Sequence, residues 1–390
     1  MRIVITGGGS GGHISPALAV IEQLKEKAKA EKTPLQLLYI GGKLSMEGTK
    51  GPSVEQKILP QTDIPYVFIH AGKLQRSFSL KTPLLLWGAI PGFFEALYHL
   101  LIFKPDVIFS TGGFVTVPIV LTGWLLRIPI VVHEQTAAVG LSNKIGGFLA
   151  KIVAVSFPTS VKEFPKEKVV VTGNPIRSEI LAAREARKQP PTTIRQLADQ
   201  LRTIYITGGA QGSHIINETI KKALPKLLQR GKIIHQCGSN EIYNDFEHLS
   251  DTAKELPEEL FEHYEIIEYI GPKQIGQVFA KVNLVISRAG ANTVNELAAL
   301  GIPALLIPIP WVTNNEQYKN ARILVNAGSA RIIPEDELTA EKLLSEIDAM
   351  LANLNDFQSK AQELQKEVRL DAANKLAEII WKIASSKRTL

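Results

Sequence analysis

The chain has 390 residues, of which 45% are hydrophobic and 21% are charged. This length exceeds what one hydrophobic core usually supports, so two domains of similar size are expected, and the composition excludes an intrinsically disordered chain. Lys and Arg outnumber Asp and Glu by 44 to 38, a formal charge of +6, which favours an anionic partner such as phosphate or acidic lipid without singling one out.

Cys237 is the single cysteine of the chain. An internal disulfide and a cysteine-based metal cluster are therefore excluded, and a reducing compartment fits. The amino-terminal residues run directly into a strand pattern, which leaves no room for a signal peptide. We therefore expect a cytoplasmic protein.

Short apolar runs alternate with longer helical patterns, which predicts βαβ units and buried parallel sheets. In the first half the strand-like runs are residues 3–6, 35–40, 107–110, 130–133 and 152–156. In the second half they are residues 203–207, 233–237, 265–269, 284–287 and 304–307. The opening Ile3-Val-Ile-Thr-Gly-Gly is repeated as Ile204-Tyr-Ile-Thr-Gly-Gly. The pattern predicts an α/β protein with two Rossmann-like domains that face a cleft.

The predicted domain boundary lies in the segment Thr172-Gly-Asn-Pro-Ile-Arg177, where Gly and Pro interrupt the pattern. The first domain is then residues 1–172 and the second residues 173–371. Residues 357–387 have helical periodicity without Gly or Pro. By analogy with folds of this kind, the last helix, about residues 372–390, is expected to pack back on the first domain.

The first glycine loop has two interpretations. Gly7, Gly9 and Gly12 match the dinucleotide pattern GxGxxG between a strand and a helix. An NAD site normally has an acidic residue at the end of the second strand, but here that strand pattern ends in Gly41-Gly42. Unpaired amides at a helix N-terminus could instead bind an anion or a polar substrate beside His13. A tight turn capped by His13 is the structural alternative.

Two further glycine segments indicate a nucleotide diphosphate. Gly208-Gly-Ala-Gln-Gly-Ser213 and Ser287-Arg-Ala-Gly-Ala-Asn-Thr-Val-Asn-Glu296 each follow a strand and open a helix, a phosphate-binding arrangement. The chain has no Asp-x-Asp motif to hold a metal ion against a diphosphate. Glu296 could accept hydrogen bonds from ribose hydroxyls, or could be an ordinary acidic residue that the helix dipole stabilises near the N-terminus. Residues 314–318 could bind sugar hydroxyls or be a solvated loop.

Taken together, the ordered motifs resemble the MurG family over nearly the whole chain. They are Gly8-Gly-Ser-Gly-Gly-His13, Ser110-Thr-Gly-Gly-Phe114, His133-Glu-Gln135, Gly140-Leu-Ser-Asn-Lys144, Gly173-Asn-Pro-Ile-Arg177, Gly208-Gly-Ala-Gln-Gly212 and Ser287-Arg-Ala-Gly290. The family transfers N-acetylglucosamine (GlcNAc) from UDP-GlcNAc to the C4 hydroxyl of lipid I (MurNAc-pentapeptide-pyrophosphoryl-undecaprenol), forming lipid II for peptidoglycan. The resemblance implies a glycosyltransferase B fold, with the acceptor on the N-terminal domain and most of the donor on the C-terminal one.

The resemblance also implies a set of donor-binding positions. They are Ser10, Gly11, Gly12, Thr136, Arg177, Ala210, Gln211, Gly212, Ile270, Arg288, Gly290, Ala291, Asn292, Thr293, Val294, Asn295, Glu296 and Gln317. In this assignment Ile270 contacts uracil through its backbone, Glu296 the ribose and Gln317 the sugar hydroxyls. Arg177 lies near phosphate.

The chain departs from the family at three of its motif positions. Thr136 stands where the family usually has Asn, Ala210 where it usually has Ser, and Glu316 where some relatives have Gln. Each change alters one side-chain partner, so the sugar contacts follow less directly from the resemblance than the fold does.

Displacement of the nucleotide by an acceptor hydroxyl needs a general base and stabilisation of the departing diphosphate. His13 is the predicted base, because an imidazole titrates near neutrality. Glu134 is a second candidate, or orients the base, or is a buried carboxylate that organises its loop. The family inverts the anomeric carbon, which implies direct displacement and a β-linked product, with no cofactor and no metal.

Residues 80–103 form the most apolar stretch of the chain. Pro83, Pro91, Glu95 and His99 argue against a membrane span, and flanking Lys and Arg residues are typical of an interfacial segment. We expect peripheral attachment to the inner face of the cell membrane; the alternative is that the stretch packs on its own sheet. The positions expected at the acceptor and membrane are Lys73, Arg76, Trp87, Phe93, Phe94, Trp124 and Asn143.

The expected partners are UDP-GlcNAc, lipid I, the membrane surface and other cell-wall synthesis proteins, with no nucleic acid. Alternatives are another enzyme of the same fold, such as a glycolipid synthase or a UDP-sugar epimerase, a nicotinamide oxidoreductase, and a noncatalytic binding protein. The missing acid after the second strand weighs against the oxidoreductase, and the presence of both His13 and Glu134 against the binding protein.

Overall fold

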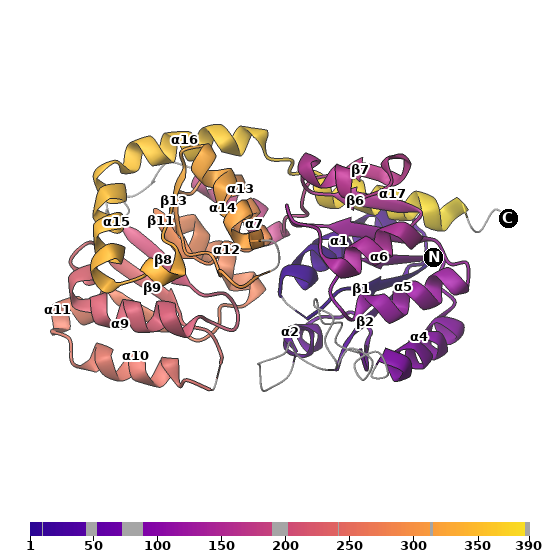
Figure 1. Cartoon of the computed structure of the whole chain (residues 1–390), viewed down its shortest axis with the longest axis horizontal. Coiled ribbons are helices and arrows are strands. Elements are labelled where there is room, and N and C mark those ends of the chain that lie inside the picture. Colours follow the sequence, from indigo (N-terminus) through magenta and orange to yellow (C-terminus); the bar gives the residue numbers. More distant parts are fainter. Residues whose placement is uncertain are drawn as a thin grey trace. The chain divides into compact units, whose positions relative to one another are not determined.

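The structure, a computed structural model, describes residues 1–9, 11–43, 53–71, 89–188, 202–240, 242–312 and 315–386. The chain forms two compact units, coloured along the sequence in Figure 1. The first unit comprises Met1–Arg177 and Arg369–Leu390, and the second Ser178–Val368. Each unit has a parallel sheet with helices on its faces (Figure 1), which confirms the predicted pair of Rossmann-like folds.

The described residues of the first unit form a seven-stranded parallel sheet. Its strands are β1 (Arg2–Thr6), β2 (Gln36–Gly42), β3 (Tyr66–Ile69), β4 (Val107–Ser110), β5 (Ile130–Glu134), β6 (Ile152–Val155) and β7 (Val169–Val171). The inner strands are runs of Val, Ile and Phe buried on both faces, as parallel sheets require. The order β3-β2-β1-β4-β5-β6-β7 reverses direction between β1 and β4. Ligands bind at the carboxyl ends of strands at such a switch point.

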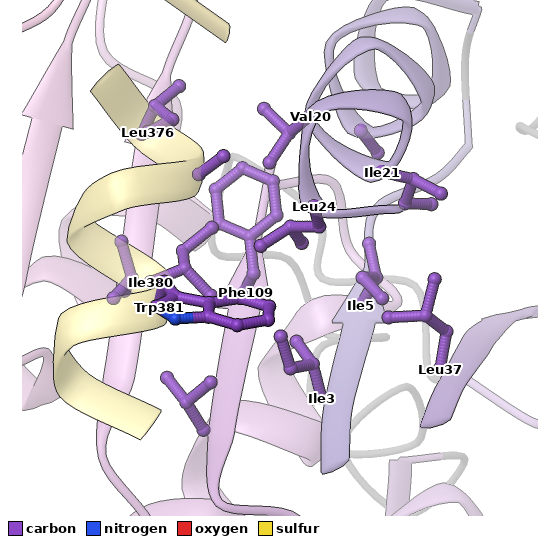
Figure 2. Close-up of a cluster of buried hydrophobic side chains, with 14 of the residues drawn as sticks. Ile3, Ile5, Val20, Ile21, Leu24, Leu37, Phe109, Leu376, Ile380 and Trp381 are labelled. Carbon is purple, nitrogen blue, oxygen red and sulfur yellow. The ribbon is translucent and has the colours of Figure 1, made fainter. Parts of the chain in front are cut away.

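The helices of the first unit cover both faces of this sheet. They are α1 (Gly11–Ala30), α2 (Val54–Ile58), η1 (Leu59–Gln61), α4 (Ala89–Phe103), α5 (Thr116–Leu125), α6 (Leu141–Leu149), η2 (Pro158–Glu163), η3 (Lys166–Lys168) and α17 (Ala372–Ser386). Helix α17 packs against α1, and Leu376, Ile380 and Trp381 join the core beside β1 and β4 (Figure 2). The Trp381 indole also donates a hydrogen bond to Glu31 at 2.8 Å.

The described residues of the second unit form a six-stranded parallel sheet in the order β10-β9-β8-β11-β12-β13. Its strands are β8 (Thr203–Thr207), β9 (Lys232–Gln236), β10 (Tyr264–Ile267), β11 (Leu284–Ser287), β12 (Ala304–Leu306) and β13 (Ala330–Ile332). Its helices are α7 (Ser178–Arg187), α9 (His214–Leu228), α10 (Asp245–Lys254), α11 (Glu258–Phe261), α12 (Pro272–Lys281), α13 (Ala291–Leu300), α14 (Glu316–Asn326), η5 (Glu335–Glu337), α15 (Ala340–Ala352) and α16 (Leu354–Glu367). The switch point here lies between β8 and β11, where the second and third glycine segments follow their strands.

The first unit extends to Arg177, whereas the predicted boundary follows Thr172. The intervening segment stays with the first sheet because His133 donates a hydrogen bond to the Gly173 carbonyl at 3.3 Å. Gly173 has φ +88°, and Arg369 lies so close that an added Cβ would be 3.1 Å from the Cβ of Arg369. The chain therefore leaves and re-enters the first unit at adjacent points.

Two buried histidines, on β5 and β9, are expected to make the fold sensitive to acid. Burial lowers the pKa of His133 to about 4 and that of His235 to about 3, whereas an unfolded histidine titrates at about 6.5. Below that pH the unfolded chain binds more protons than the folded one. The free energy of unfolding therefore falls as the pH drops, by about 2 kcal/mol per histidine at pH 5. It keeps falling until the pH reaches the pKa values of the folded state.

Urea unfolding at pH 7.5 and pH 5 measures this loss. His235→Gln removes one of the two titrating groups, so its stability should depend less steeply on pH than that of the unaltered protein. If the free energy of unfolding depends equally steeply on pH in both proteins, His235 does not contribute to the acid sensitivity.

Candidate active site

The first glycine loop, residues 7–12, leaves the carboxyl end of β1 at the switch point of the first sheet. The segment after β4 holds it, because the Gly8 amide donates to the Gly112 carbonyl at 3.1 Å. Gly113 has φ +92°, and a Cβ there would lie 1.9 Å from the Gly8 carbonyl oxygen, so this close backbone approach requires glycine. Gly11 and Gly12 begin α1. Ser10 lies outside the described residues.

A buried carboxylate that no predicted motif contains supports the same loop. Glu55 accepts a hydrogen bond from the Gly9 amide at 2.7 Å, and its side chain is fully buried. Burial raises the pKa of Glu55. Both the Gly8 and Gly9 amides are thus bonded to protein acceptors, so an anion at this loop would need other donors. The sequence signal for this region is the capping box of Ser53 and Gln56, which marks the start of α2.

His13 lies in the first turn of α1 and is hydrogen-bonded to the segment after β4. Its Nδ1 donates to the Thr111 carbonyl at 2.9 Å, and the Thr111 hydroxyl donates to the His13 carbonyl at 2.7 Å. The side-chain amide of Gln135 lies 2.5 Å from the same Nδ1. The Thr111 carbonyl can only accept. With the Gln135 amide turned so that its otherwise unpartnered oxygen faces the ring, both groups accept from Nδ1, so the proton of the neutral ring sits on Nδ1 and the lone pair is on Nε2. This tautomer is the one in which Nε2 can take a proton.

Glu134 lies 1% exposed at the end of β5, inside a network of donors. Its carboxylate accepts hydrogen bonds from the Thr136 amide (2.9 Å), the Gly140 amide (3.2 Å) and the Asn143 side chain (3.0 Å), and the Thr136 hydroxyl lies 2.7 Å away. Burial raises the pKa of Glu134, and these hydrogen bonds oppose the rise. The network brings together three predicted site residues, Glu134, Thr136 and Asn143, and these residues hydrogen-bond to one another. It fits a carboxylate that organises its loop.

Apolar side chains are exposed on two neighbouring helices of the first unit, which we call the α4–α5 patch. Its exposed members are Ile90, Phe94, Tyr98, Leu101 and Ile102 on α4 and Leu121, Trp124 and Leu125 on α5. Phe93 is half-buried.

The predicted positions Lys73, Arg76 and Trp87 lie outside the described residues. Among the helices of the described ranges, none is both long enough and apolar enough to cross a bilayer.

The second glycine loop follows β8 and leads into α9. Gly209 and Gly212 have φ +92° and +79°, a conformation that favours glycine, and the Gly212 amide donates to the Gly209 carbonyl at 3.0 Å. The Gly209 amide donates to the Thr207 hydroxyl at 2.9 Å. Ala210, Gln211 and Gly212 are half-buried at the surface of this turn. The predicted donor positions therefore lie on a tight turn directly before a helix N-terminus.

Arg288 is buried rather than presented on the surface. Its guanidinium pairs with Glu335 and donates to the Ser213 hydroxyl at 2.7 Å and to the Ile307 carbonyl at 3.1 Å. Burial lowers the pKa of Arg288, and Glu335 opposes that shift. Arg288 thus links the second glycine loop, the third glycine segment and η5. We interpret it as a residue that positions these loops.

The third glycine segment caps α13, with Gly290 at the N-cap. Asn292, Thr293 and Asn295 are half-buried, while Ala291 and Glu296 are buried. Val294 is 1% exposed, and its amide donates to the Gly290 carbonyl at 3.0 Å, so the structure places Val294 in the core.

Gln317 and Asn320 lie one turn apart on α14 and hold the third glycine segment from the side. The Gln317 oxygen accepts from the amides of Ala289 (3.2 Å) and Ile309 (3.1 Å). Asn320 is fully buried and donates to the Ala289 carbonyl at 3.2 Å. No motif predicts Asn320, although its spacing from Gln317 places both on one helix face. Glu316 is the first residue of α14 and is half-buried.

The two remaining donor positions lie in different units. Ile270 is 6% exposed, just after β10, and its amide donates to the side chain of Gln236 at 3.1 Å. Arg177 is half-buried and is the last residue of the first unit before α7.

One group of side chains among the described residues could hold a metal ion. Ligand atoms of His214, Glu218 and Asp245 lie within 4.8 Å of one another. His214 and Asp245 are already hydrogen-bonded at 2.7 Å, and the His214 ring stacks on Tyr243 with centroids 4.0 Å apart. A hydrogen bond and a ring stack account for these contacts, and we assign no metal to them.

Known proteins match the chain along almost its whole length. The glycosyltransferase family 28 N-terminal domain matches residues 3–155, and the family 28 C-terminal domain matches residues 203–376. A relative from Thermoanaerobacter sp. (strain X514) is 36% identical over 98% of this chain and 100% of its own. A relative from Desulforamulus reducens is 34% identical over 98% of this chain and 99% of its own. Both are named UDP-N-acetylglucosamine--N-acetylmuramyl-(pentapeptide) pyrophosphoryl-undecaprenol N-acetylglucosamine transferase.

The chain belongs to glycosyltransferase family 28. Among solved structures, Acinetobacter baumannii MurG matches this family 28 glycosyltransferase with a TM-score of 0.69 and 25% identity, over 98% of this chain and 99% of that one. The predicted MurG resemblance and glycosyltransferase B fold are thereby confirmed. UDP-GlcNAc 2-epimerase from Neisseria meningitidis matches with a TM-score of 0.66 at 15% identity, over 98% and 100% of the two chains, a likeness of fold alone.

Proposed function

We propose that this protein transfers GlcNAc from UDP-GlcNAc to the C4 hydroxyl of lipid I and so forms lipid II for peptidoglycan. The observation that carries the proposal is the match to relatives named for this reaction, at 36% and 34% identity over 98% of the chain. The geometry within each unit is compatible with it.

His13 is the proposed general base on the acceptor side. The Thr111 carbonyl fixes the ring through Nδ1 at 2.9 Å, which leaves Nε2 as the basic nitrogen. There it would take the proton of the acceptor hydroxyl as that oxygen attacks the anomeric carbon from the face opposite the diphosphate. The attack inverts the anomeric carbon and gives a β-linked product. Glu134 supports the loop that carries Gln135, whose amide also contacts His13.

The donor is proposed to bind at the switch point of the second sheet. The half-buried turn Ala210–Gly212 precedes α9, and Gly290 caps α13. Helix N-termini carry a partial positive charge and stabilise a departing diphosphate without a metal ion. Arg288, Gln317 and Asn320 would hold these loops in place, and the remaining donors of Gln317 would contact sugar hydroxyls.

The acceptor is a membrane lipid, and the α4–α5 patch is the proposed attachment surface. Phe94 is 62% exposed and Trp124 is 55% exposed, and large exposed apolar side chains on adjacent helices are typical of a membrane contact. Peripheral attachment to the inner face of the cell membrane follows, because the UDP-sugar is in the cytoplasm.

The experiment is transfer from radiolabelled UDP-GlcNAc to a short-chain lipid I analogue in the presence of EDTA. We expect a labelled disaccharide lipid and release of UDP, and addition of Mg²⁺ should not raise the rate. UDP binding without transfer would overturn the acceptor assignment. Conversion of UDP-GlcNAc to its 2-epimer would indicate a UDP-sugar epimerase instead.

A further inference from the structure

Gln236, the last residue of β9, uses every hydrogen-bonding position of its side chain within the second unit. Its oxygen accepts from the Ile270 amide at 3.1 Å and from the Tyr205 hydroxyl at 3.3 Å. Its nitrogen donates to the Thr207 hydroxyl at 3.2 Å and to the Gly209 carbonyl at 3.0 Å. A primary amide has two donor hydrogens and two acceptor lone pairs, so all four are engaged.

The partners themselves determine which way the amide of Gln236 points. The Ile270 amide can only donate and therefore faces the oxygen, while the Gly209 carbonyl can only accept and therefore faces the nitrogen. A rotated amide would break both contacts. The side chain is 5% exposed, so water cannot readily replace a lost partner.

The position of β9 in the sheet explains why this side chain can join two loops. β9 lies between β8 and β10, and neighbouring strands are about 4.8 Å apart. The second glycine loop follows β8, and the segment with Ile270 follows β10. A side chain at the carboxyl end of the central strand of the three reaches both, and Gln236 contacts one loop with each end of its amide.

The residues after Gln236 hold the second glycine loop from the same side. A Cβ on Gly212 would lie 1.9 Å from the Cys237 carbonyl oxygen, so the two backbones are in close contact. The Ser239 amide donates to the Ala210 carbonyl at 3.3 Å. The loop therefore rests on the end of β9 at several points. The Gly238 amide donates to the Glu268 carbonyl at 2.9 Å, and the Gln236 side chain extends the connection to Ile270.

We propose that Gln236 is a positioning residue that fixes the distance between the phosphate-binding loop and the base-binding segment, so that one uridine diphosphate fits both. The inference rests on the proposed function, because that function assigns phosphate to the loop at Gly209–Gly212 and uracil to Ile270. A ligand that spans both segments depends on Gln236 more than one that occupies a single segment.

The test uses Gln236→Leu in the full-length protein, a change of similar size that removes all four hydrogen bonds. We expect the KM for UDP-GlcNAc to rise about tenfold and the inhibition constant of UDP to rise equally, with kcat within about threefold of the original. The inhibition constant of uridine, which binds one segment only, should change by less than about threefold.

Gln365→Leu is the matched control. Gln365 lies in the same unit and donates to the Ala299 carbonyl at 2.9 Å, joining α16 to α13. Its loss should lower stability and leave the KM unchanged. Equal changes in KM in the two variants would mean that Gln236 acts through general stability, and an unchanged KM in Gln236→Leu would also overturn the inference.

Tyr205→Phe provides a second test if Gln236→Leu does not fold. It removes one hydrogen bond to Gln236 and keeps the ring that packs edge-on against Phe279 at 5.7 Å. We expect the KM to rise two- to fivefold, about the effect of one hydrogen bond, and an unchanged KM would overturn the inference. If the unaltered protein neither binds UDP nor transfers the sugar, the proposed function itself fails. If it does both, a negative result counts against Gln236 alone.

Discussion

Replacing His13 with Ala is expected to lower the turnover of lipid II formation by about 10²- to 10⁴-fold, the usual contribution of a general base. The ring is held through Nδ1 by the Thr111 carbonyl at 2.9 Å, so its only basic nitrogen is Nε2. Loss of that nitrogen removes the proton acceptor, while the two loops proposed to bind the diphosphate, Gly209–Gly212 and the segment at Gly290, lie in the other unit. The KM for UDP-GlcNAc and the affinity for UDP should therefore stay within about threefold. Steady-state transfer assays and UDP titration measure the two effects.

Glu134→Gln is the comparison that separates the two candidate bases. Whichever way the new amide points, its nitrogen faces a backbone donor, the Thr136 amide on one side or the Gly140 amide on the other. Two facing donors cost stability, so we expect the free energy of unfolding to fall by about 1 to 3 kcal/mol. Transfer by the protein that remains folded should persist. Loss of transfer in Glu134→Gln with an unaffected His13→Ala would make Glu134 the base.

The largest stability effect is expected for Arg288→Met, a loss of about 3 to 5 kcal/mol in the free energy of unfolding of the second unit. Arg288 and Glu335 are both 8% exposed and form an ion pair. Removing the guanidinium leaves a buried carboxylate without its cation and leaves Ser213 and Ile307 without their donor. Urea unfolding measures the loss, and weaker UDP binding should accompany it because two glycine segments lose their link.

Two further variants establish that burial is the cause. Arg288→Met combined with Glu335→Leu should regain much of the lost stability, because no unpaired charge remains. Arg230→Met breaks the more exposed pair with Asp348, whose side chain is 54% exposed, and should cost at most about 1 kcal/mol. If the double variant is as unstable as Arg288→Met alone, the unpaired charge is not the source of the loss.

Much of the fold follows from short stretches of sequence. The central strands are continuous runs of Val, Ile and Leu because both faces of a parallel sheet are buried, and each run predicted in the first half coincides with a strand. Three strands at or near the sheet edges were not among the predicted runs: β3 (Tyr66–Ile69), β7 (Val169–Val171) and β13 (Ala330–Ile332). They are short and only partly buried, so their hydrophobic pattern is weak.

The sequence by itself also determined the positions of the glycine loops, because glycine at fixed places between a strand and a helix has a local cause. Only the tertiary structure decided what supports those loops. Glu55 reaches Gly9 across 46 positions of the chain, and Gln236 reaches Ile270 across 34. A side chain that acts by satisfying a distant backbone group leaves no pattern among its neighbours in sequence. Its role becomes visible only when folding brings the strand ends together.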